Sequence, residues 1–384
     1  MTSFPEMSRR SLVKGILVAG SAAVLVGCGD TGTTSGSSPS ASGEAGGGSG
    51  PITIKDQRGK TLTFERPVTS VVTIPMPAAS LLVAVDESAA HLSAMHSASW
   101  TAMRTGIMGT MFPNALKIPH DIAAQDFTPN VESIRALNPD VVIQWSDAQL
   151  TAPLEDAGLK VVGFNNTGSE QDVEAWTALF AQMLGKPQRA AQLQARSNDE
   201  LHQVQSLAKG RTAGPRVLYF NRFVGGLKVA ASGTYNDFYI RLVGAQNAAV
   251  GPHGAGAAAL VGVDVEQVLA WDPEIILLGN FDAALPKDVY TNSVWQSVSA
   301  VRNRRVYKVP LGGYRWDPPG QESPLMWHWL SDVSYPQPHS DLRAKIVDYY
   351  RLLYSYEPTT GQMDGILWRD ANASSADYAQ FLST

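Results

Sequence analysis

The apolar positions of this chain fall into short continuous runs separated by segments with helical spacing, from residue 51 onward. Residues 51–65 alternate polar and apolar side chains around Asp56–Gly59, a pattern that predicts a β-hairpin. Residues 78–85 predict a helix. The continuous runs predict strands buried on both faces of a parallel sheet, at residues 68–74, 141–143 and 158–164. Strands that alternate with helices in this way indicate an α/β fold.

The same alternation returns after residue 210, with a predicted helix at residues 235–242. Strands are predicted at residues 215–220, 275–278 and 305–309. Residues 190–208 contain neither glycine nor proline and predict one long helix between the two halves. The expected fold is therefore α/β, with two Rossmann-like lobes joined by a long rigid helix. The segments are a first lobe at residues 51–168, a linking helix at 169–210, a second lobe at 211–322 and packed C-terminal helices at 323–384.

One sequence unit occurs twice in the chain. Residues 129–143 and 263–277 share a capping residue, a Val-Glu pair, an apolar helix, a polar-Pro-acidic turn and a β-branched strand. The unit places one glutamate, Glu132 or Glu266, near the start of a helix in each half. About one domain length separates the two copies. The repeat therefore indicates two similar lobes that each present an acidic residue.

Each of these glutamates has a local explanation. Asn130 and Asp264 are predicted N-caps, because a short side-chain oxygen can accept a free amide of the first turn. An acidic residue in that turn also interacts favourably with the helix dipole. A first-turn position leaves the carboxylate exposed as well, so helix stabilisation and docking to a partner both remain open.

Residues 1–27 have the pattern of an export signal rather than of a folded segment. Arg9 and Arg10 precede an apolar run at residues 15–27, which is too short to cross a bilayer as a stable helix. The arginine pair resembles a twin-arginine export signal, and an ordinary basic leader is the alternative.

The leader ends at Leu25-Val-Gly-Cys28, which resembles the lipobox of bacterial lipoproteins. Cys28 is the only cysteine of the chain, which excludes a disulfide within it, and we predict that it carries a lipid. Residues 28–50 are dominated by glycine, serine, threonine and alanine and predict a flexible tether. The predicted location is the outer face of the cell membrane, with the lipid as anchor.

Charge and motifs exclude several classes of function. The formal net charge of −5 gives no indication of nucleic-acid binding or of attraction to an anionic membrane surface. The chain lacks a Gly-x-Ser-x-Gly elbow, a P-loop and a His-Glu-x-x-His motif, so we do not expect an enzyme. A surface lipoprotein that only binds partners, without a role in transport, is a distant alternative.

Several segments, taken in their order along the chain, together resemble the substrate-binding proteins of ABC importers for iron–siderophore complexes, haem and cobalamin. The resemblance covers nearly all of residues 51–356. It rests on the two Val-Glu units, on Met183-Leu-Gly-Lys-Pro-Gln-Arg-Ala190, on Leu242-Val-Gly-Ala-Gln-Asn247 and on residues 295–307. Two departures lie near the expected pocket: Ser80 stands where the family usually has glutamate, and Asp86 where glycine is common.

The resemblance implies class III architecture, in which one long helix joins two lobes and the ligand lies in the cleft between them. It also implies that Glu132 and Glu266 pair with arginines of an ABC permease dimer. The resemblance also implies a monomer. No resident cofactor is expected, because the metal arrives within the bound chelate.

Candidate ligand contacts follow from the loops after the strands, which face the cleft in open α/β sheets. Arg222 and Arg315 could hold an anionic chelate, since a guanidinium forks onto carboxylate or catecholate oxygens. The aromatic and histidine candidates are Trp145, Tyr314, Trp316, Trp100 and His96.

A ferric siderophore is the first expected ligand, and haem or a corrinoid is the alternative. His96 or His120 would then ligate the haem iron or the cobalt. A lone histidine, however, is more often an ordinary packed or solvated residue than a ligand. The chain shows no Cys/His/Asp cluster with the spacing of a bare-metal site, so we expect no protein-held metal ion.

Overall fold

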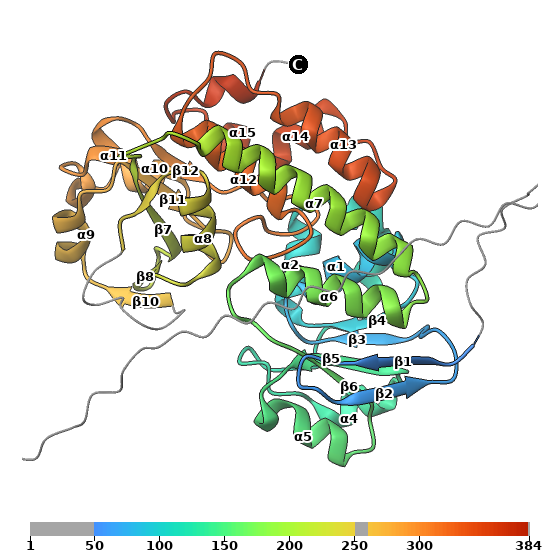
Figure 1. Ribbon diagram of the computed structural model, residues 1–384. Helices are drawn as coiled ribbons and strands as arrows, with labels where there is room; N and C mark the ends of the chain where they lie inside the picture. Colours follow the sequence, from blue (N-terminus) through green and yellow to red (C-terminus); the bar gives the residue numbers. More distant parts are fainter. Residues whose placement is uncertain (1–49, 250–259, 383–384) are drawn as a thin grey trace, which may run out of the picture. The chain divides into compact units, whose positions relative to one another are not determined.

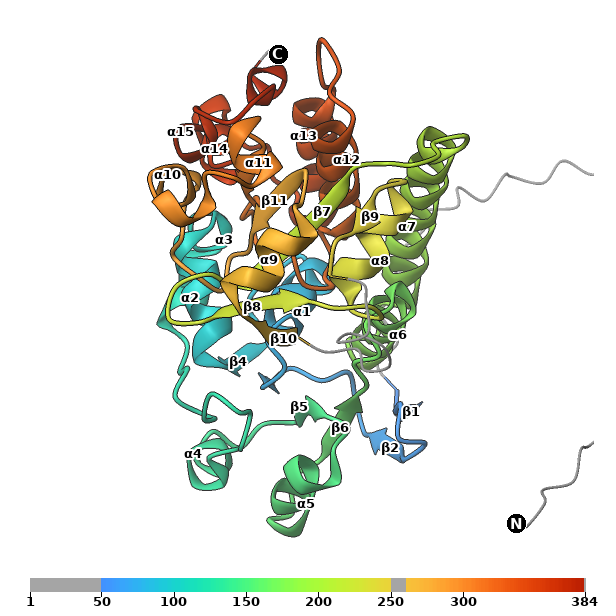
Figure 2. The same ribbon diagram turned by 90° about the vertical axis from the view of Figure 1, so that its left-hand side faces the viewer.

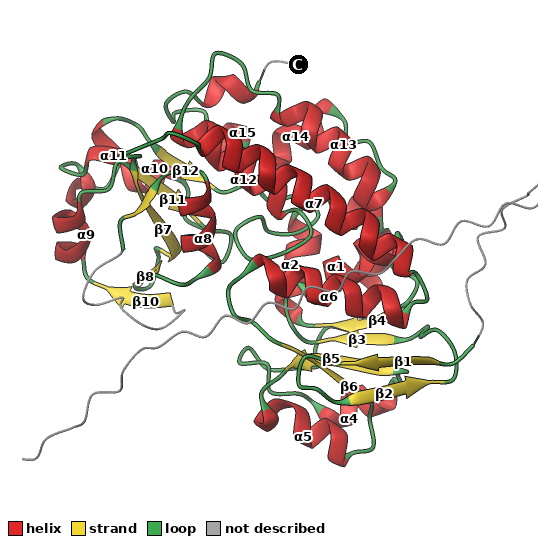
Figure 3. Cartoon of the chain, in the orientation of Figure 1, coloured by secondary structure: helices red, strands yellow, loops and turns green. Residues whose placement is uncertain are grey.

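The computed structural model describes residues 50–249 and 260–382, and all of them belong to one compact unit. Two separate sheets, each with helices around it, form two lobes (Figures 1 and 3). Within the described ranges, no helix is both long enough and apolar enough to cross a membrane.

The first lobe contains a parallel sheet with strand order β4-β3-β5-β6. Its strands are β3 (Val71–Thr73), β4 (Leu92–Met95), β5 (Val141–Trp145) and β6 (Val161–Phe164). The predicted hairpin is confirmed as β1 (Ile52–Lys55) paired antiparallel with β2 (Thr61–Phe64). The helices are α1 (Ala78–Asp86), α2 (Ser97–Thr105), α3 (Met108–Met111), α4 (Val131–Ala136) and α5 (Ala148–Asp156), with a short 3-10 helix η1 (Pro113–Lys117).

The second lobe is built on a mixed sheet with strand order β10-β8-β7-β11-β12, in which β9 also pairs with β7. The strands β7, β11 and β12 run parallel, whereas β8 and β10 are antiparallel additions. The bounds are β7 (Arg216–Arg222), β8 (Leu227–Ala230), β9 (Gln246–Asn247), β10 (Leu260–Val263), β11 (Ile275–Leu278) and β12 (Val306–Lys308). The helices are α8 (Tyr235–Leu242), α9 (Val265–Trp271), α10 (Pro286–Tyr290), α11 (Ser299–Arg302) and the 3-10 helix η2 (Ser293–Trp295).

The linking segment is two helices rather than one helix over residues 169–210. Helix α6 (Glu170–Met183) packs on α1, and α7 (Pro187–Ala208) packs on α6 and α12. Gly185, with φ of +69°, and Pro187 separate them, because neither residue favours a continuous helix here. Helix α7 alone is the long linking helix (Figure 2). Its 22 residues correspond to a length of about 33 Å.

The C-terminal helices pack back on the rest of the molecule, as predicted. They are α12 (Ser323–Ser334), α13 (Leu342–Tyr354), α14 (Thr360–Ile366), α15 (Arg369–Asn372) and the 3-10 helix η3 (Tyr378–Phe381). One hydrophobic core contains Val71 of the first sheet, Trp176 of α6, Leu277 of the second sheet and Trp327 of α12. The two sheets therefore share a core through the linking and C-terminal helices.

The repeated sequence unit is also a repeated structural unit. The Asn130 side chain accepts a hydrogen bond from the Ser133 amide, and the Asp264 side chain accepts one from Gln267, which confirms both N-caps. Asn138 and Asp272, the residues before the two prolines, both adopt left-handed backbone conformations, with φ of 45° and 42°. Asparagine and aspartate tolerate this region better than most residues.

Candidate functional site

Arg315 lies in the long loop between β12 and α12, and it is only 7% exposed. Its Nε donates to the carbonyl of Asn280 at 3.2 Å, and Nη1 donates to the carbonyl of Ala98 at 3.1 Å. The guanidinium carbon lies 4.6 Å from the centre of the Phe281 ring. In the described part of the chain, no carboxylate forms an ion pair with this side chain. A buried cation without an ionic partner is costly unless an anion or further acceptors reach it.

Two neighbours of Arg315 have buried polar atoms that find no hydrogen-bond partner within the described residues. They are the Asn280 Oδ1 and the Tyr314 hydroxyl. The Tyr314 ring centre lies 5.7 Å from the Arg315 guanidinium carbon, and burial raises the pKa of this phenol to about 12. Buried polar groups are nearly always satisfied in native proteins. A donor and an acceptor left open beside a buried cation are features of a ligand site.

Asn280 lies two residues after the end of β11 and links that end to the segment just after β12. Its Nδ2 donates to the carbonyls of Val309 and Pro310 at 3.0 and 2.9 Å. Its amide donates to Asp317 Oδ2 at 2.9 Å, and the Tyr219 hydroxyl donates to the same oxygen at 2.6 Å. The carboxylate of Asp317 is therefore engaged away from Arg315. Asn280 is not among the contacts predicted from the sequence, although its place after the strand at residues 275–278 is a usable signal.

Lys308 supplies a second buried cation near Arg315. Its Nζ donates to the carbonyls of Gly279 and Asp282 at 2.8 and 2.7 Å. Burial lowers the pKa of this ammonium group to about 8. The negative charges of Asp317 and Asp282 oppose this shift, whereas the positive charge of Arg315 adds to it. The region is thus built to keep its cations desolvated.

His96 does not have the free ring nitrogen that ligation of haem iron or cobalt requires. Its Nδ1 accepts the Ala98 amide at 3.0 Å and so caps α2, while Nε2 lies 3.0 Å from the carbonyl of Ala124. Since an acceptor at Nδ1 leaves the proton on Nε2, the ring is a neutral donor to that carbonyl. Burial first, and the charge of Arg315 as well, lower the pKa of His96. Both ring nitrogens are thus engaged within the protein, and the contact of His96 with a ligand stays a prediction.

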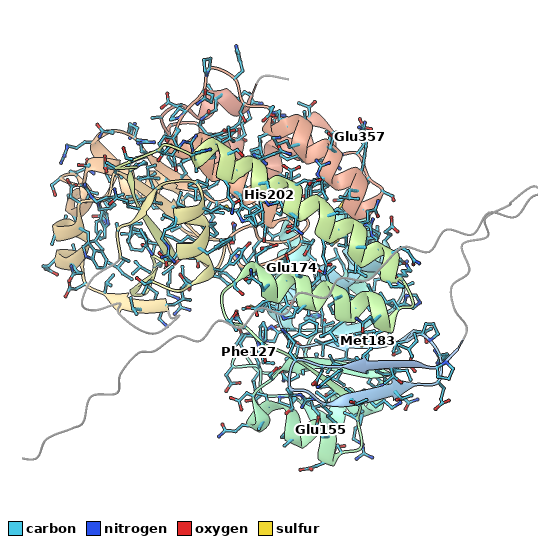
Figure 4. All side chains as sticks on the ribbon, in the orientation of Figure 1. Phe127, Glu155, Glu174, Met183, His202 and Glu357 are labelled. Carbon is cyan, nitrogen blue, oxygen red and sulfur yellow. The ribbon has the colours of Figure 1, made fainter. Side chains whose placement is uncertain are left out.

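The tryptophans of the first lobe are both half-buried packing residues. Trp100 stacks on His120 with ring centres 4.4 Å apart, and its indole N–H donates to Leu116. Trp145 is the last residue of β5 and contacts Phe127 edge-on at 6.0 Å (Phe127 is labelled in Figure 4). Their predicted contact with a ligand stays a prediction.

Trp316 and Arg222 lie in very different surroundings. Trp316 is completely buried, and its indole N–H donates to Glu322 Oε2 at 2.6 Å. The predicted stacking of a ligand on this ring is contradicted, because core atoms cover it. Arg222 ends β7, where it pairs with Lys228 of β8, and its side chain is exposed.

Glu132 and Glu266 are both exposed in the first turns of α4 and α9. Neither carboxylate forms an ion pair with any cation of the described ranges. Cys28, the leader and nearly all of the tether lie outside the described residues.

One groove, of about 930 Å³, contains none of the predicted site residues. It lies between the α2–α3 turn, the start of α10 and the α14–α15 region. Within residues 50–249 and 260–382, no three acidic, histidine or cysteine side chains come together as a metal site.

Comparisons with known proteins agree with this architecture. A family model described as periplasmic binding protein matches residues 123–311. The molybdate-binding protein MolA of Haemophilus influenzae is 26% identical over 271 residues, which are 60% of this chain and 71% of that protein.

Solved structures extend the likeness to both lobes. A periplasmic solute-binding protein of Veillonella parvula superposes with a TM-score of 0.77 and 28% identity, over 86% of this chain and 100% of that one. MolA bound to molybdate shares the fold, with a TM-score of 0.68 and 21% identity over 80% of this chain and 99% of that one. These relatives are binding proteins and not enzymes. The chain is therefore similar in sequence and in fold to the periplasmic binding proteins, with the two-lobe architecture of solute-binding components of ABC importers.

Proposed function

We propose that this protein captures an anionic metal complex at Arg315 and delivers it to its ABC permease, with a ferric siderophore as the cargo. One observation carries the proposal. The Arg315 guanidinium is buried, it donates only to backbone carbonyls, and the described residues provide no anion to pair with it.

The chemistry of the surrounding groups supports an anionic ligand with several oxygens. A guanidinium presents parallel N–H donors that match the paired oxygens of a catecholate or carboxylate. The open Tyr314 hydroxyl can donate to a further oxygen, and the open Asn280 Oδ1 can accept from a ligand N–H or O–H. The Phe281 ring beside Arg315 offers an apolar surface to an aromatic chelate.

Molybdate is a second candidate, because the relative MolA is named for binding it. A small oxyanion would need the same donors but no aromatic surface. Haem or a corrinoid is less favoured than in the sequence analysis, since His96 has no ring nitrogen free for iron or cobalt.

Attachment and docking complete the proposal. A lipid on Cys28 would hold the protein at the outer face of the membrane, and residues 28–50 would let it reach the permease. Glu132 and Glu266, exposed on one helix of each lobe, would each meet a cation of one permease subunit.

Titration of the purified protein tests the choice of cargo. Tryptophan fluorescence and calorimetry would follow the addition of an anionic ferric catecholate, a neutral ferric hydroxamate, haemin, cobalamin and molybdate. We expect the ferric catecholate to bind at about micromolar concentration or below and the neutral complex to bind much more weakly. Binding of molybdate alone would establish the second candidate, and binding of neutral complexes alone would contradict an anion site at Arg315.

A further inference from the structure

The loop that carries Arg315 is buried over almost its whole length, from Val309 to Glu322. Loops usually run over the surface, because buried backbone groups need hydrogen-bond partners. Some of these partners are ordinary: Leu311 donates to Ile366, and the Gly312 carbonyl accepts from Ile107 of the first lobe. Asp317 is held by Tyr219 and Asn280, and a further anchor is a side chain at the end of the loop itself.

Glu322 is that anchor, and its buried carboxylate accepts four hydrogen bonds. Oε1 accepts from the Gly313 amide at 2.9 Å and from the Tyr354 hydroxyl at 2.5 Å. Oε2 accepts from the Trp316 indole at 2.6 Å and from the Tyr350 hydroxyl at 3.0 Å. Each oxygen thus has one N–H donor from the loop and one hydroxyl donor from α13.

The two glycines of the loop make room for this carboxylate. A Cβ atom on Gly312 would collide with Glu322 Oε2 and the Tyr350 hydroxyl, and one on Gly313 would lie 2.6 Å from Glu322 Oε1. The close approach of the backbone to a buried side chain explains why glycine is needed at both positions.

The two loop donors flank Arg315 in sequence, at Gly313 and Trp316. Fixing the backbone at Gly313 and the indole side chain at Trp316 limits where the guanidinium of residue 315 can lie. We propose that Glu322 is a positioning residue for ligand binding: it clamps the loop from both sides so that Arg315 meets its anion in a preset orientation. This inference rests on the proposed function, because it takes Arg315 as the ligand's partner.

The substitution Glu322→Gln changes the hydrogen bonds of this side chain but keeps its packing. The amide has the shape of the carboxylate, but one of its two ends is an N–H donor. Whichever way it turns, that end faces either the Gly313 amide or the Trp316 indole, and neither of these donors can become an acceptor. The hydroxyls of Tyr350 and Tyr354 can reverse their roles, so the loop side alone loses a bond.

The experiment compares Glu322→Gln with Tyr354→Phe, which removes one hydroxyl donor to Glu322 and the acceptor of the Gln321 side chain but keeps both N–H donors of the loop to Glu322. Affinity for an anionic ferric catecholate and for molybdate would be measured by calorimetry, and hydrogen exchange of residues 309–322 by mass spectrometry. We expect Glu322→Gln to lose about tenfold in affinity for the probe that the wild type binds and to exchange faster in this loop. Tyr354→Phe should lose stability but less than about twofold in affinity.

Two outcomes would overturn the positioning role while the wild type binds a probe. One is wild-type affinity in Glu322→Gln, and the other is an equal loss of affinity in Tyr354→Phe. Trp316→Phe, which removes the other loop donor, replaces Glu322→Gln if that variant does not fold, with the same expected loss. A wild type that binds neither probe would instead contradict the proposed function, and the positioning role with it.

Discussion

The guanidinium of Arg315 donates a 3.1 Å hydrogen bond to the carbonyl of Ala98, although 217 positions separate the two residues. Arg315 follows β12 of the second lobe, whereas Ala98 lies in the first turn of α2 in the first lobe. This bond therefore joins the lobes beside the proposed ligand site. A ligand that pairs with the guanidinium would add to a contact that already spans both lobes.

Removing that guanidinium should weaken ligand binding strongly. We expect Arg315→Ala to reduce affinity for an anionic ferric catecholate by about 100-fold, because a desolvated charge-assisted pair is lost. The affinity of Arg315→Lys should lie between those of the wild type and Arg315→Ala, since lysine keeps the positive charge but not the paired N–H donors of the guanidinium. Calorimetry of the three proteins gives the ranking. Arg135→Ala, at an exposed position on α4 that is not a candidate ligand contact, serves as the control and should bind like the wild type.

Much of the fold could be predicted from the apolar runs, because buried parallel strands are short and strongly hydrophobic. Strands β8 and β10 were not predicted, because neither is marked by such a hydrophobic run. Residues 260–263 alternate between exposed and half-buried positions and contain Gly262, so no apolar run marks the strand. The pairing of β8 with β10 depends on tertiary contacts that local sequence does not encode.

The candidate site was only partly predictable. Arg315 could be found because it follows a predicted strand, but the sequence does not show that both Arg315 and Trp316 are buried. The buried Glu322 accounts for part of this burial, since it accepts a hydrogen bond from the Trp316 indole. Asn280 was missed because a single asparagine carries no chemical signature until its hydrogen bonds are known.

Glu170 should make the stability of the protein depend on pH. Burial raises the pKa of this carboxyl from 4.5 to about 8, while hydrogen bonds from Tyr235 and Ser197 oppose the shift. Between these two values the folded protein holds a proton that the unfolded chain releases. The free energy of unfolding should therefore fall as pH rises from about 5 to about 8, by at most about 1.4 kcal/mol per pH unit from this group.

Urea unfolding of Glu170→Gln isolates this contribution, because glutamine stays neutral throughout. Relative to wild type, the variant should gain stability as pH rises and reach its greatest advantage near pH 8. A slope in Glu170→Gln equal to that of wild type would show that Glu170 titrates normally.

Gly312→Ala should destabilise the protein by about 2 kcal/mol or more, because the added methyl group collides with the Glu322 carboxylate and the Tyr350 hydroxyl. Gly361→Ala is a matched control in the first turn of α14, where a Cβ meets no atom within 4 Å. It should be neutral or stabilising by up to about 1 kcal/mol, since alanine favours the helix. Chemical denaturation of both variants measures the difference, and equal stabilities would contradict the tight approach at Gly312.

The pair Glu132 and Glu266 offers the sharpest test of docking, because both carboxylates are exposed and lie away from Arg315 in sequence and in secondary structure. We expect the double substitution Glu132→Ala and Glu266→Ala to abolish uptake of the bound complex by cells. Ligand affinity of the purified double variant should stay within about twofold of wild type, since no ligand contact is removed. Glu65→Ala, at another exposed glutamate, should leave both uptake and affinity unchanged. Loss of affinity in the double variant would assign the glutamates to the ligand site instead, and full uptake would leave them only the role of stabilising their helices.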